Sequence, residues 1–264
     1  VGAEGTLGVI TEVTVRLSGI PEAISAAVCA FPSLEAAVRC SILLIQSGVP
    51  VARVELLDKV QMEACIQYSG LEYEPEPTLF FEFHGTRASI REQAKSVREM
   101  AAELGAGNFR WAEKTEERSQ LWQARHDALY AALAFKPGTV AWSTDVCVPI
   151  SKLVSCIEQT RIDIEAIALT ATIVGHVGDG NYHVIFLLDP GRPQDFKDAQ
   201  RVNERMVLRA IAADGTCTGE HGVGIGKQHF LKKEFGGGLD VMKDLKCTLD
   251  PLNIMNPGKI FVHS

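Results

Sequence analysis

Two histidines, His176 and His183, flank a compact turn in the stretch GHVGDGNYH, which covers residues 175–183. The Asp-Gly-Asn triplet in its middle is typical of a turn, because glycine tolerates positive φ and Asp and Asn side chains bond their own backbone. Apolar runs rich in β-branched residues lie on both sides, at residues 169–174 and 184–188. The stretch therefore predicts a strand, turn, strand hairpin that brings the two imidazoles close together.

A third metal-type residue follows in the segment TGEHG, residues 218–222, whose glycines indicate that the backbone passes close to another group. With His176 and His183, its glutamate Glu220 gives a His, His, Glu set for one divalent ion, with ligand distances of about 2.0–2.1 Å for zinc. Such a set leaves coordination positions open, which is typical of a reactive metal. His221, next to the glutamate, is predicted to be an unligated base beside the metal.

Composition, charge and cysteine usage limit the class of protein. Hydrophobic residues make up 46% of the 264 residues, enough for a packed core in one large or two smaller domains. The net charge of −7, with no basic block, argues against nucleic acid as a partner. Charged residues interrupt the apolar run at residues 157–174, so we expect no membrane span. Seven cysteines without a CxxC pair fit reduced thiols in an intracellular compartment.

Strand and helix patterns alternate along most of the chain. We expect strands at residues 9–17, 26–31, 51–57, 78–84, 108–111 and 140–148, besides the hairpin. We expect helices at residues 34–47, 58–68, 90–104, 116–134, 151–164, 194–213 and 241–245. Because long continuous Val/Ile strands are lacking, the pattern favours an α+β fold, with helices packed on one face of a mainly antiparallel sheet. A glycine-rich helical segment follows at the C-terminus.

Arg125 lies on or beside the apolar face of the helix predicted at residues 116–134. It is three residues from Trp122 and four from Leu121 and Leu129. A guanidinium in that place needs an anionic partner, unless its long side chain reaches back to solvent. The sequence leaves both alternatives open.

Five motifs, in this order, resemble those of the FAD-linked 2-hydroxyacid dehydrogenases of the vanillyl-alcohol-oxidase type. They are EGTLGVIT (residues 4–11), LWxxR (121–125), GHVGDGNYH (175–183), EHGVGIGK (220–227) and NPGKIF (256–261). Their joint occurrence is far more specific than any single motif, and together they span essentially the whole chain.

The resemblance implies a division into three parts. Residues 1–18 would be the last piece of an FAD-binding domain, 19–214 a substrate (cap) domain, and 215–264 a C-terminal segment that completes the active site. The N-terminal FAD domain, with most of the FAD cradle, would lie outside the chain. We therefore expect this chain to be inactive by itself.

The resemblance also implies roles for individual residues. It places FAD-binding positions at Glu4, Gly5, Gly8, Ile10 and Asn256. His176, His183 and Glu220 match ligands of a divalent metal, zinc or manganese, and His221 matches the catalytic histidine. Arg125 matches the arginine that pairs with the substrate carboxylate.

The implied substrate is a monocarboxylic acid. Relatives that oxidise 2-hydroxy dicarboxylic acids hold the second carboxylate with polar or charged side chains, at positions that are Leu129, Ser143 and Ile185 here. An apolar pocket lacks a cation for that carboxylate, whose uncompensated burial is costly. The expected reaction is oxidation of D-lactate and related D-2-hydroxy monocarboxylic acids to 2-oxo acids. The resemblance further implies a mitochondrial location and an electron acceptor such as cytochrome c or an electron-transfer flavoprotein.

Three alternatives stay open. A D-2-hydroxyglutarate-type dehydrogenase would use the same metal set and base with a different pocket. A metal-dependent hydrolase could also use two histidines, a glutamate and a base, although the flavin motif at residues 4–11 argues for the flavoenzyme. A non-catalytic module with a structural metal would normally supply four protein ligands, whereas the sequence offers three.

Overall fold

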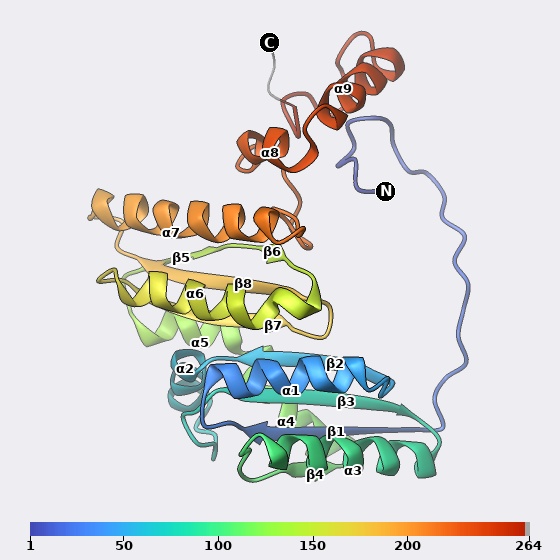
Figure 1. Ribbon diagram of the computed structural model, residues 1–264, viewed down its shortest axis with the longest axis vertical. Helices are drawn as coiled ribbons and strands as arrows, with labels where there is room; N and C mark the ends of the chain where they lie inside the picture. The colour runs from blue at the N-terminus through green and yellow to red at the C-terminus, as the bar shows by residue number, and fades with distance from the viewer. Residues whose placement is uncertain (262–264) are drawn as a thin grey trace.

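At the centre of the structure, a computed structural model that describes residues 1–261, lies an eight-stranded antiparallel sheet (Figure 1). The strand order is β4-β1-β3-β2-β7-β8-β5, and β6 also pairs with β8. The strands are β1 (Ala23–Ala30), β2 (Val51–Leu57), β3 (Thr78–Gly85), β4 (Arg110–Ala112), β5 (Val140–Ser143), β6 (Val146–Cys147), β7 (Thr170–His176) and β8 (Asn181–Leu188). The predicted hairpin, β7 and β8, lies within this sheet.

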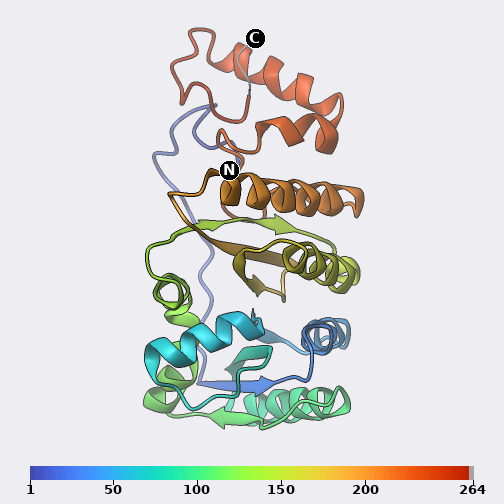
Figure 2. The same ribbon diagram turned by 90° about the vertical axis from the view of Figure 1, so that its left-hand side faces the viewer.

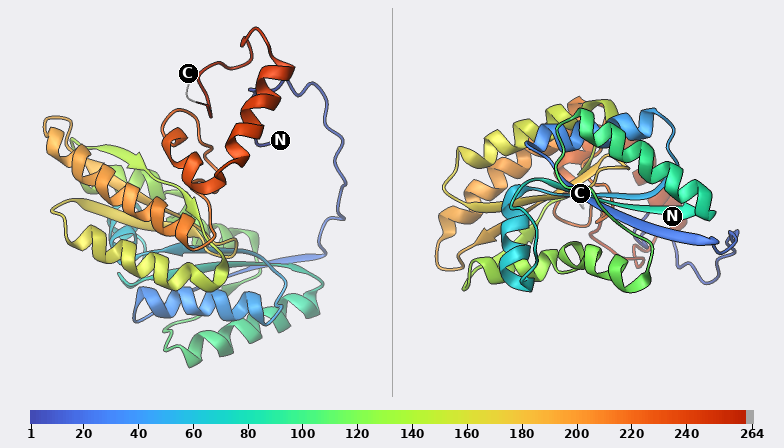
Figure 3. Two further views of the ribbon diagram at one scale, coloured as in Figure 1. Left: turned by 45° about the horizontal axis from the view of Figure 1, so that its top comes forward. Right: turned by 90° about the horizontal axis from the view of Figure 1, so that it is seen from below.

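Helices cover both faces of the sheet (Figure 3). One layer consists of α1 (Leu34–Gln46), α3 (Arg87–Glu103), α6 (Leu153–Glu165) and α7 (Pro193–Ala212). The other consists of α2 (Lys59–Ser69), α4 (Thr115–His126) and α5 (Ala128–Phe135). Each helical layer packs on its own hydrophobic core. Neighbouring residues of β3 point into different cores, since Phe81 packs in the core under the first layer and Phe80 in the core under the second. The α+β class with an antiparallel sheet is confirmed, and the second helical layer adds to the single layer expected.

Local chemistry explains some of the element boundaries. The hydroxyl of Ser33 accepts a hydrogen bond from the backbone N–H of Ala36 and caps α1, which begins at Leu34, where the sequence predicts a helix to start. The helix predicted at residues 116–134 is interrupted at Asp127, whose carboxylate accepts a hydrogen bond from Ser69 of α2. The strand predicted at residues 140–148 is likewise split into β5 and β6.

The strand expected at residues 9–17 is wrong. Residues 8–21 form an extended segment without regular secondary structure, which runs along the side of the molecule (Figure 1). The side chains of Val9, Val13 and Leu17 are exposed. A strand needs a neighbour for its backbone N–H and C=O groups, and within residues 1–261 this segment has none.

A small helical lobe follows the sheet domain and lies beside the N-terminal turn (Figure 2). It contains the short 3-10 turn η2 (Gln228–Phe230) and the helices α8 (Leu231–Phe235) and α9 (Gly238–Leu249). Another 3-10 turn, η1 (Ile150–Lys152), directly precedes α6. The buried Lys246 ammonium donates to the carbonyl oxygen of Thr6 at 2.7 Å and pairs with Asp250. This contact joins the C-terminal lobe to the N-terminal turn. None of the helices in residues 1–261 is both long and apolar enough to cross a membrane.

Candidate metal centre and active site

The β7–β8 hairpin places both predicted histidines on one face of the sheet. Val174 pairs with His183 and His176 pairs with Asn181, so the two imidazoles lie on the same side of the pleat. Their ring centroids are 5.8 Å apart. The turn requires glycine at Gly180, where φ is +79° and a Cβ would lie 2.1 Å from a backbone carbonyl oxygen.

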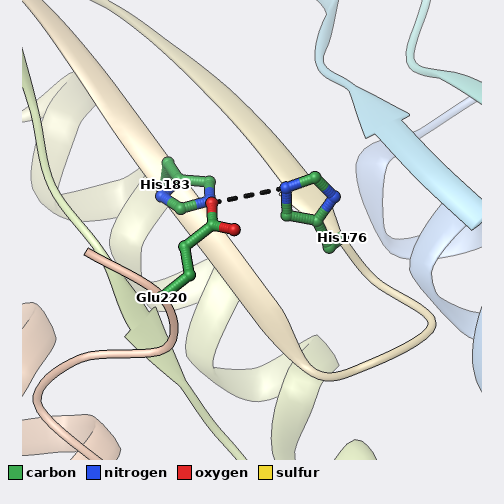
Figure 4. Close-up of side chains that lie close together, drawn as sticks. All are labelled: His176, His183 and Glu220. Carbon is green, nitrogen blue, oxygen red and sulfur yellow. Dashed lines mark ion pairs between the residues drawn. The ribbon is translucent and has the colours of Figure 1, made fainter. Parts of the chain in front are cut away.

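Glu220 reaches both histidines from the segment after α7 (Figure 4). Its Oε1 lies 3.1 Å from His183 Nε2 and 3.4 Å from His176 Nε2. The three candidate ligand atoms all lie within 4.8 Å of one another. The structure thus brings together the three residues that the sequence singled out as metal ligands.

The hydrogen bonds of the two histidines fix which ring nitrogen is free. His183 Nδ1 donates to the carbonyl oxygen of Thr144 at 2.9 Å, and His176 Nδ1 donates to the Glu55 carboxylate at 2.8 Å. Each neutral imidazole therefore keeps an Nε2 lone pair toward Glu220. His183 Nε2 is buried and has no hydrogen-bond partner within the described residues. Such an orphaned acceptor beside a carboxylate fits a divalent cation, and the outer partners match those of metal-bound histidines.

The surroundings move the two histidine pKa values in opposite directions. The hydrogen bond to Glu55 raises the pKa of His176. Burial lowers the pKa of His183, because desolvation disfavours the charged ring. A neutral His183 is the form that can bind a metal.

His221, the predicted base, lies at the same point but outside the His, His, Glu set. Its ring stacks on that of His183 with a centroid distance of 4.9 Å, and its Nε2 is 3.5 Å from Glu220 Oε1. The side chain is 47% exposed. An incoming molecule can therefore reach the imidazole next to the three candidate ligands.

Asp145, which the sequence did not single out, shapes the segment that carries Glu220 and His221. This buried carboxylate follows β5 and accepts backbone hydrogen bonds from Gly219 at 2.9 Å, Glu220 at 3.1 Å and His221 at 3.0 Å. The ammonium of Lys227 lies 3.3 Å away. Burial alone would raise the pKa of Asp145, but a hydrogen bond from the Thr218 hydroxyl, the backbone hydrogen bond from His221 and the lysine charge hold it well below its usual range.

We expect Asp145→Asn to destabilise the protein by about 2–4 kcal/mol, because the amide is neutral and one of its ends is a donor facing donors. The measurement is urea unfolding at pH 7, with Asp240→Asn, an exposed carboxylate paired with Lys232, as control. The pKa of Asp145 is lower in the folded than in the unfolded protein. The stability that its carboxylate contributes is therefore fully present above about pH 4, and it declines as the pH falls toward the pKa of the folded state. Equal stability of the two variants would contradict this role.

The anionic partner of Arg125 is Glu55. Arg125 Nε donates to Glu55 Oε2 at 3.0 Å, and the arginine side chain is 22% exposed. Of the two alternatives left by the sequence, a paired guanidinium or one that reaches to solvent, the structure has the first. Neither Nη atom of Arg125 has a hydrogen-bond partner in residues 1–261, so that end of the guanidinium is free to bind another anion.

The predicted pocket residues are only partly gathered. Ser143 on β5 pairs directly with Ile185 on β8, and Ile185 lies two residues from His183 on the same strand face. Ile185 is buried in the core that also contains α4 and α5. Leu129 lies on α5 and is 47% exposed, outside that core.

The predicted FAD-binding residues fall into two groups. Glu4, Gly5 and Asn256 are close together, since Asn256 Nδ2 donates to the Glu4 carbonyl oxygen and lies near Gly5. The Glu4 carboxylate accepts the backbone N–H groups of residues 223 and 224, at 2.6 and 2.9 Å. Gly8 and Ile10 lie apart from them on the exposed extended segment.

A cavity of about 620 Å³ lies between the N-terminal turn and the helical lobe. Its lining includes Glu4, Leu7, Glu220 and Phe261, so it adjoins the candidate metal ligands. The cavity leaves room for part of a bound molecule beside Glu220.

Comparison with known proteins agrees with these features. Residues 20–260 match the family model described as FAD linked oxidases, C-terminal domain. A probable mitochondrial D-lactate dehydrogenase of Danio rerio is 50% identical over 98% of this chain and 52% of its own length. The mitochondrial D-lactate dehydrogenase (cytochrome) of Arabidopsis thaliana is 46% identical over 98% of this chain and 46% of its own length. This chain therefore spans about half the length of these relatives.

Solved structures share the fold at low sequence identity. An alkyldihydroxyacetonephosphate synthase has a TM-score of 0.64 and 16% identity, over 97% of this chain and 48% of that one. The match confirms the antiparallel α+β architecture, and the family match confirms the resemblance carried by the five motifs. The chain belongs to the FAD-linked oxidases, of which it contains the C-terminal domain, and it is homologous to mitochondrial D-lactate dehydrogenases.

Proposed function

We propose that this chain is the substrate- and metal-binding half of an FAD-dependent dehydrogenase, which oxidises D-lactate and related D-2-hydroxy monocarboxylic acids to 2-oxo acids. The observation that carries the proposal is the meeting of His176, His183 and Glu220, with both Nε2 lone pairs free, beside the accessible base His221. The homology to D-lactate dehydrogenases supports the choice of substrate.

Each side chain has a role that its contacts support. The free Nη atoms of Arg125 bind the substrate carboxylate through paired hydrogen bonds. His221 accepts the proton of the 2-hydroxyl group and is open to solvent, to which it can pass the proton on. When bound, a divalent metal on His176, His183 and Glu220 supplies Lewis-acid polarisation of the hydroxyl oxygen, and FAD supplies the acceptor for the two electrons and hydrogen leaving C2.

The domain arrangement belongs to the same proposal. Residues 1–18 are the last piece of the FAD-binding domain, residues 19–214 the substrate domain, and residues 215–264 the segment that completes the site. We propose zinc or manganese as the metal, since two imidazoles and one carboxylate suit either ion, although the same ligand set also suits iron. We further propose a mitochondrial location, as in the relatives named above, and cytochrome c or an electron-transfer flavoprotein as the electron acceptor.

Substrate profiling of the FAD- and metal-loaded enzyme tests the proposal. We expect kcat/KM for D-lactate to exceed that for D-2-hydroxyglutarate by at least about 100-fold. The reason is that Ile185 is buried among apolar side chains, and an unpaired second carboxylate incurs a desolvation penalty of several kcal/mol. Aliphatic D-2-hydroxy acids should gain up to about 0.8 kcal/mol per buried methylene until the pocket is full.

A double variant provides the matched comparison. Ser143→Lys with Ile185→Asn places a cation and an amide at two paired positions, and should narrow the preference for D-lactate by about tenfold or more. Comparable kcat/KM for D-lactate and D-2-hydroxyglutarate in the unmutated enzyme would contradict the monocarboxylate assignment. Turnover of esters or amides, without reduction of the flavin, would favour the metal-dependent hydrolase.

A further inference from the structure

A buried carboxylate connects the two ends of the candidate site. Glu55 lies on β2, and its side chain is 4% exposed. Its Oε2 accepts a hydrogen bond from Arg125 Nε at 3.0 Å, and its Oε1 accepts one from His176 Nδ1 at 2.8 Å. The two donors belong to α4 and β7, so one side chain of β2 ties a helix to a neighbouring strand.

We propose that Glu55 is a positioning residue, which holds the guanidinium for the substrate carboxylate and one imidazole of the metal site at a fixed separation. The inference rests on the function proposed above, because it takes Arg125 as the carboxylate anchor and His176 as a metal ligand. Glu55 itself touches neither substrate nor metal.

The contact with His176 selects the ring form that can ligate. A carboxylate is an acceptor only, so the proton of the neutral imidazole stays on Nδ1 and the Nε2 lone pair faces Glu220. Without Glu55, the ring is free to rotate or to place its proton on Nε2. Loss of such an outer partner commonly weakens metal binding 10- to 100-fold.

The contact with Arg125 works on the other end of the site. Glu55 engages only Nε, and both Nη atoms stay without partners in residues 1–261. The guanidinium is thus oriented by one edge and presents the rest of its donors to an incoming anion. Freed from Glu55, the long side chain regains rotamer freedom, which substrate binding must then remove.

A buried carboxylate is well suited to this task, because removing charge from water is favourable only when good partners are supplied. Glu55 has two, and each comes from an element that carries a proposed functional residue. A neutral glutamine would present one acceptor and one donor. Whichever way the amide turns, its donor end meets either Arg125 or His176, which are both donors there.

The same sheet offers a matched control. Glu82 on β3 also links an arginine and a histidine, since it accepts from Arg53 at 3.2 Å and from His84 at 2.8 Å. Its side chain is 18% exposed, and its partners include none of the proposed functional residues. Glu82→Gln therefore removes a comparable pair of contacts away from the site.

The experiment compares Glu55→Gln, Glu55→Asp and Glu82→Gln in the FAD-loaded enzyme. The dissociation constant for zinc is measured by chelator competition without substrate, and kcat and KM for D-lactate are measured at saturating metal. For Glu55→Gln we expect a zinc dissociation constant raised 10- to 100-fold and a KM raised about tenfold, with a smaller change in kcat, because orientation of Arg125 serves ground-state and transition-state binding alike. Glu55→Asp keeps the charge and should recover part of both losses, and Glu82→Gln should match the unmutated enzyme.

Several outcomes would overturn the inference. Unchanged zinc binding and KM in Glu55→Gln would do so, as would equal losses in Glu82→Gln. If Glu55→Gln does not fold, the test rests on Glu55→Asp alone. A zinc dissociation constant and a KM in Glu55→Asp equal to those of the unmutated enzyme would then refute the role. If the unmutated enzyme oxidises no 2-hydroxy acid while Glu55→Gln still weakens zinc binding tenfold, the proposed function fails and the role of Glu55 toward His176 stands.

Discussion

Replacing His183 or His176 by alanine is expected to remove the metal and to lower kcat by about 10³-fold or more, while leaving the fold intact. The loss follows because Lewis-acid stabilisation of developing charge is worth several kcal/mol, and each 1.36 kcal/mol corresponds to a factor of ten in rate. The fold should persist because β7 pairs with β8 and with β2, and β8 pairs with β5. These backbone pairings form without a metal.

Metal content by elemental analysis, kcat and far-UV circular dichroism check this expectation in the loaded enzyme. His229→Ala is the control, because His229 is partly exposed, packs its ring against Phe230 and is not one of the three candidate ligands. A His183→Ala or His176→Ala protein with stoichiometric metal and unmutated kcat would show that the residue is not a ligand.

Replacing His221 by alanine should lower kcat by about 10²- to 10⁴-fold, which is the usual contribution of a general base. Metal and flavin should both be retained, because the His, His, Glu set is complete without this ring. Parallel measurement of kcat, metal content and flavin absorbance distinguishes a general base from a metal ligand. Loss of metal together with activity would identify His221 as a fourth ligand, and a kcat within a few-fold of the unmutated enzyme would exclude it as the base.

The candidate site could be predicted from the sequence where its residues lie in short, chemically distinctive segments. His176 and His183 flank a turn with its own glycine and Asx residues, so local pattern alone brings them together. Glu220 and His221 stand between glycines that the backbone requires, since a Cβ at Gly219 would lie 1.9 Å from the Asn181 side chain. Their residue types and their turns were enough to indicate one site.

The partners of these residues could not be predicted, because they depend on pairing across the fold. Glu55 lies 70 residues from Arg125 and 121 from His176, and only the order of β2 and β7 in the sheet makes them neighbours. Asp145 similarly lies 74 residues from the backbone N–H of Gly219. A glutamate inside the apolar strand β2 was a visible anomaly, since a buried charge is rare unless paired, but it did not indicate which partner it had.

The fold shows the same limit. Helix stripes and strand alternation correctly predict most elements between residues 23 and 212, because each pattern reflects one buried face. Alternation at residues 9–17 predicted a strand that the described chain lacks. An alternating pattern indicates that a segment can pair with a strand, but it does not show that a partner strand is present. The second helical layer was missed because the prediction relied on the lack of long continuous Val/Ile strands. The short apolar run Val184–Leu188 is buried on both faces, which is the pattern of a strand covered by two layers.

The most direct test of the central claim is anaerobic reduction of the flavin by D-lactate in the holoenzyme, before and after the metal is removed with a chelator. The rate of bleaching of the flavin absorbance is followed by stopped flow, and zinc or manganese is then added back. The account predicts rapid bleaching by D-lactate, a loss of about 10³-fold on metal removal, and recovery on addition of metal in the unmutated enzyme but not in His176→Ala. Bleaching at an undiminished rate without metal, or no reduction by D-lactate in the fully loaded enzyme, would contradict it.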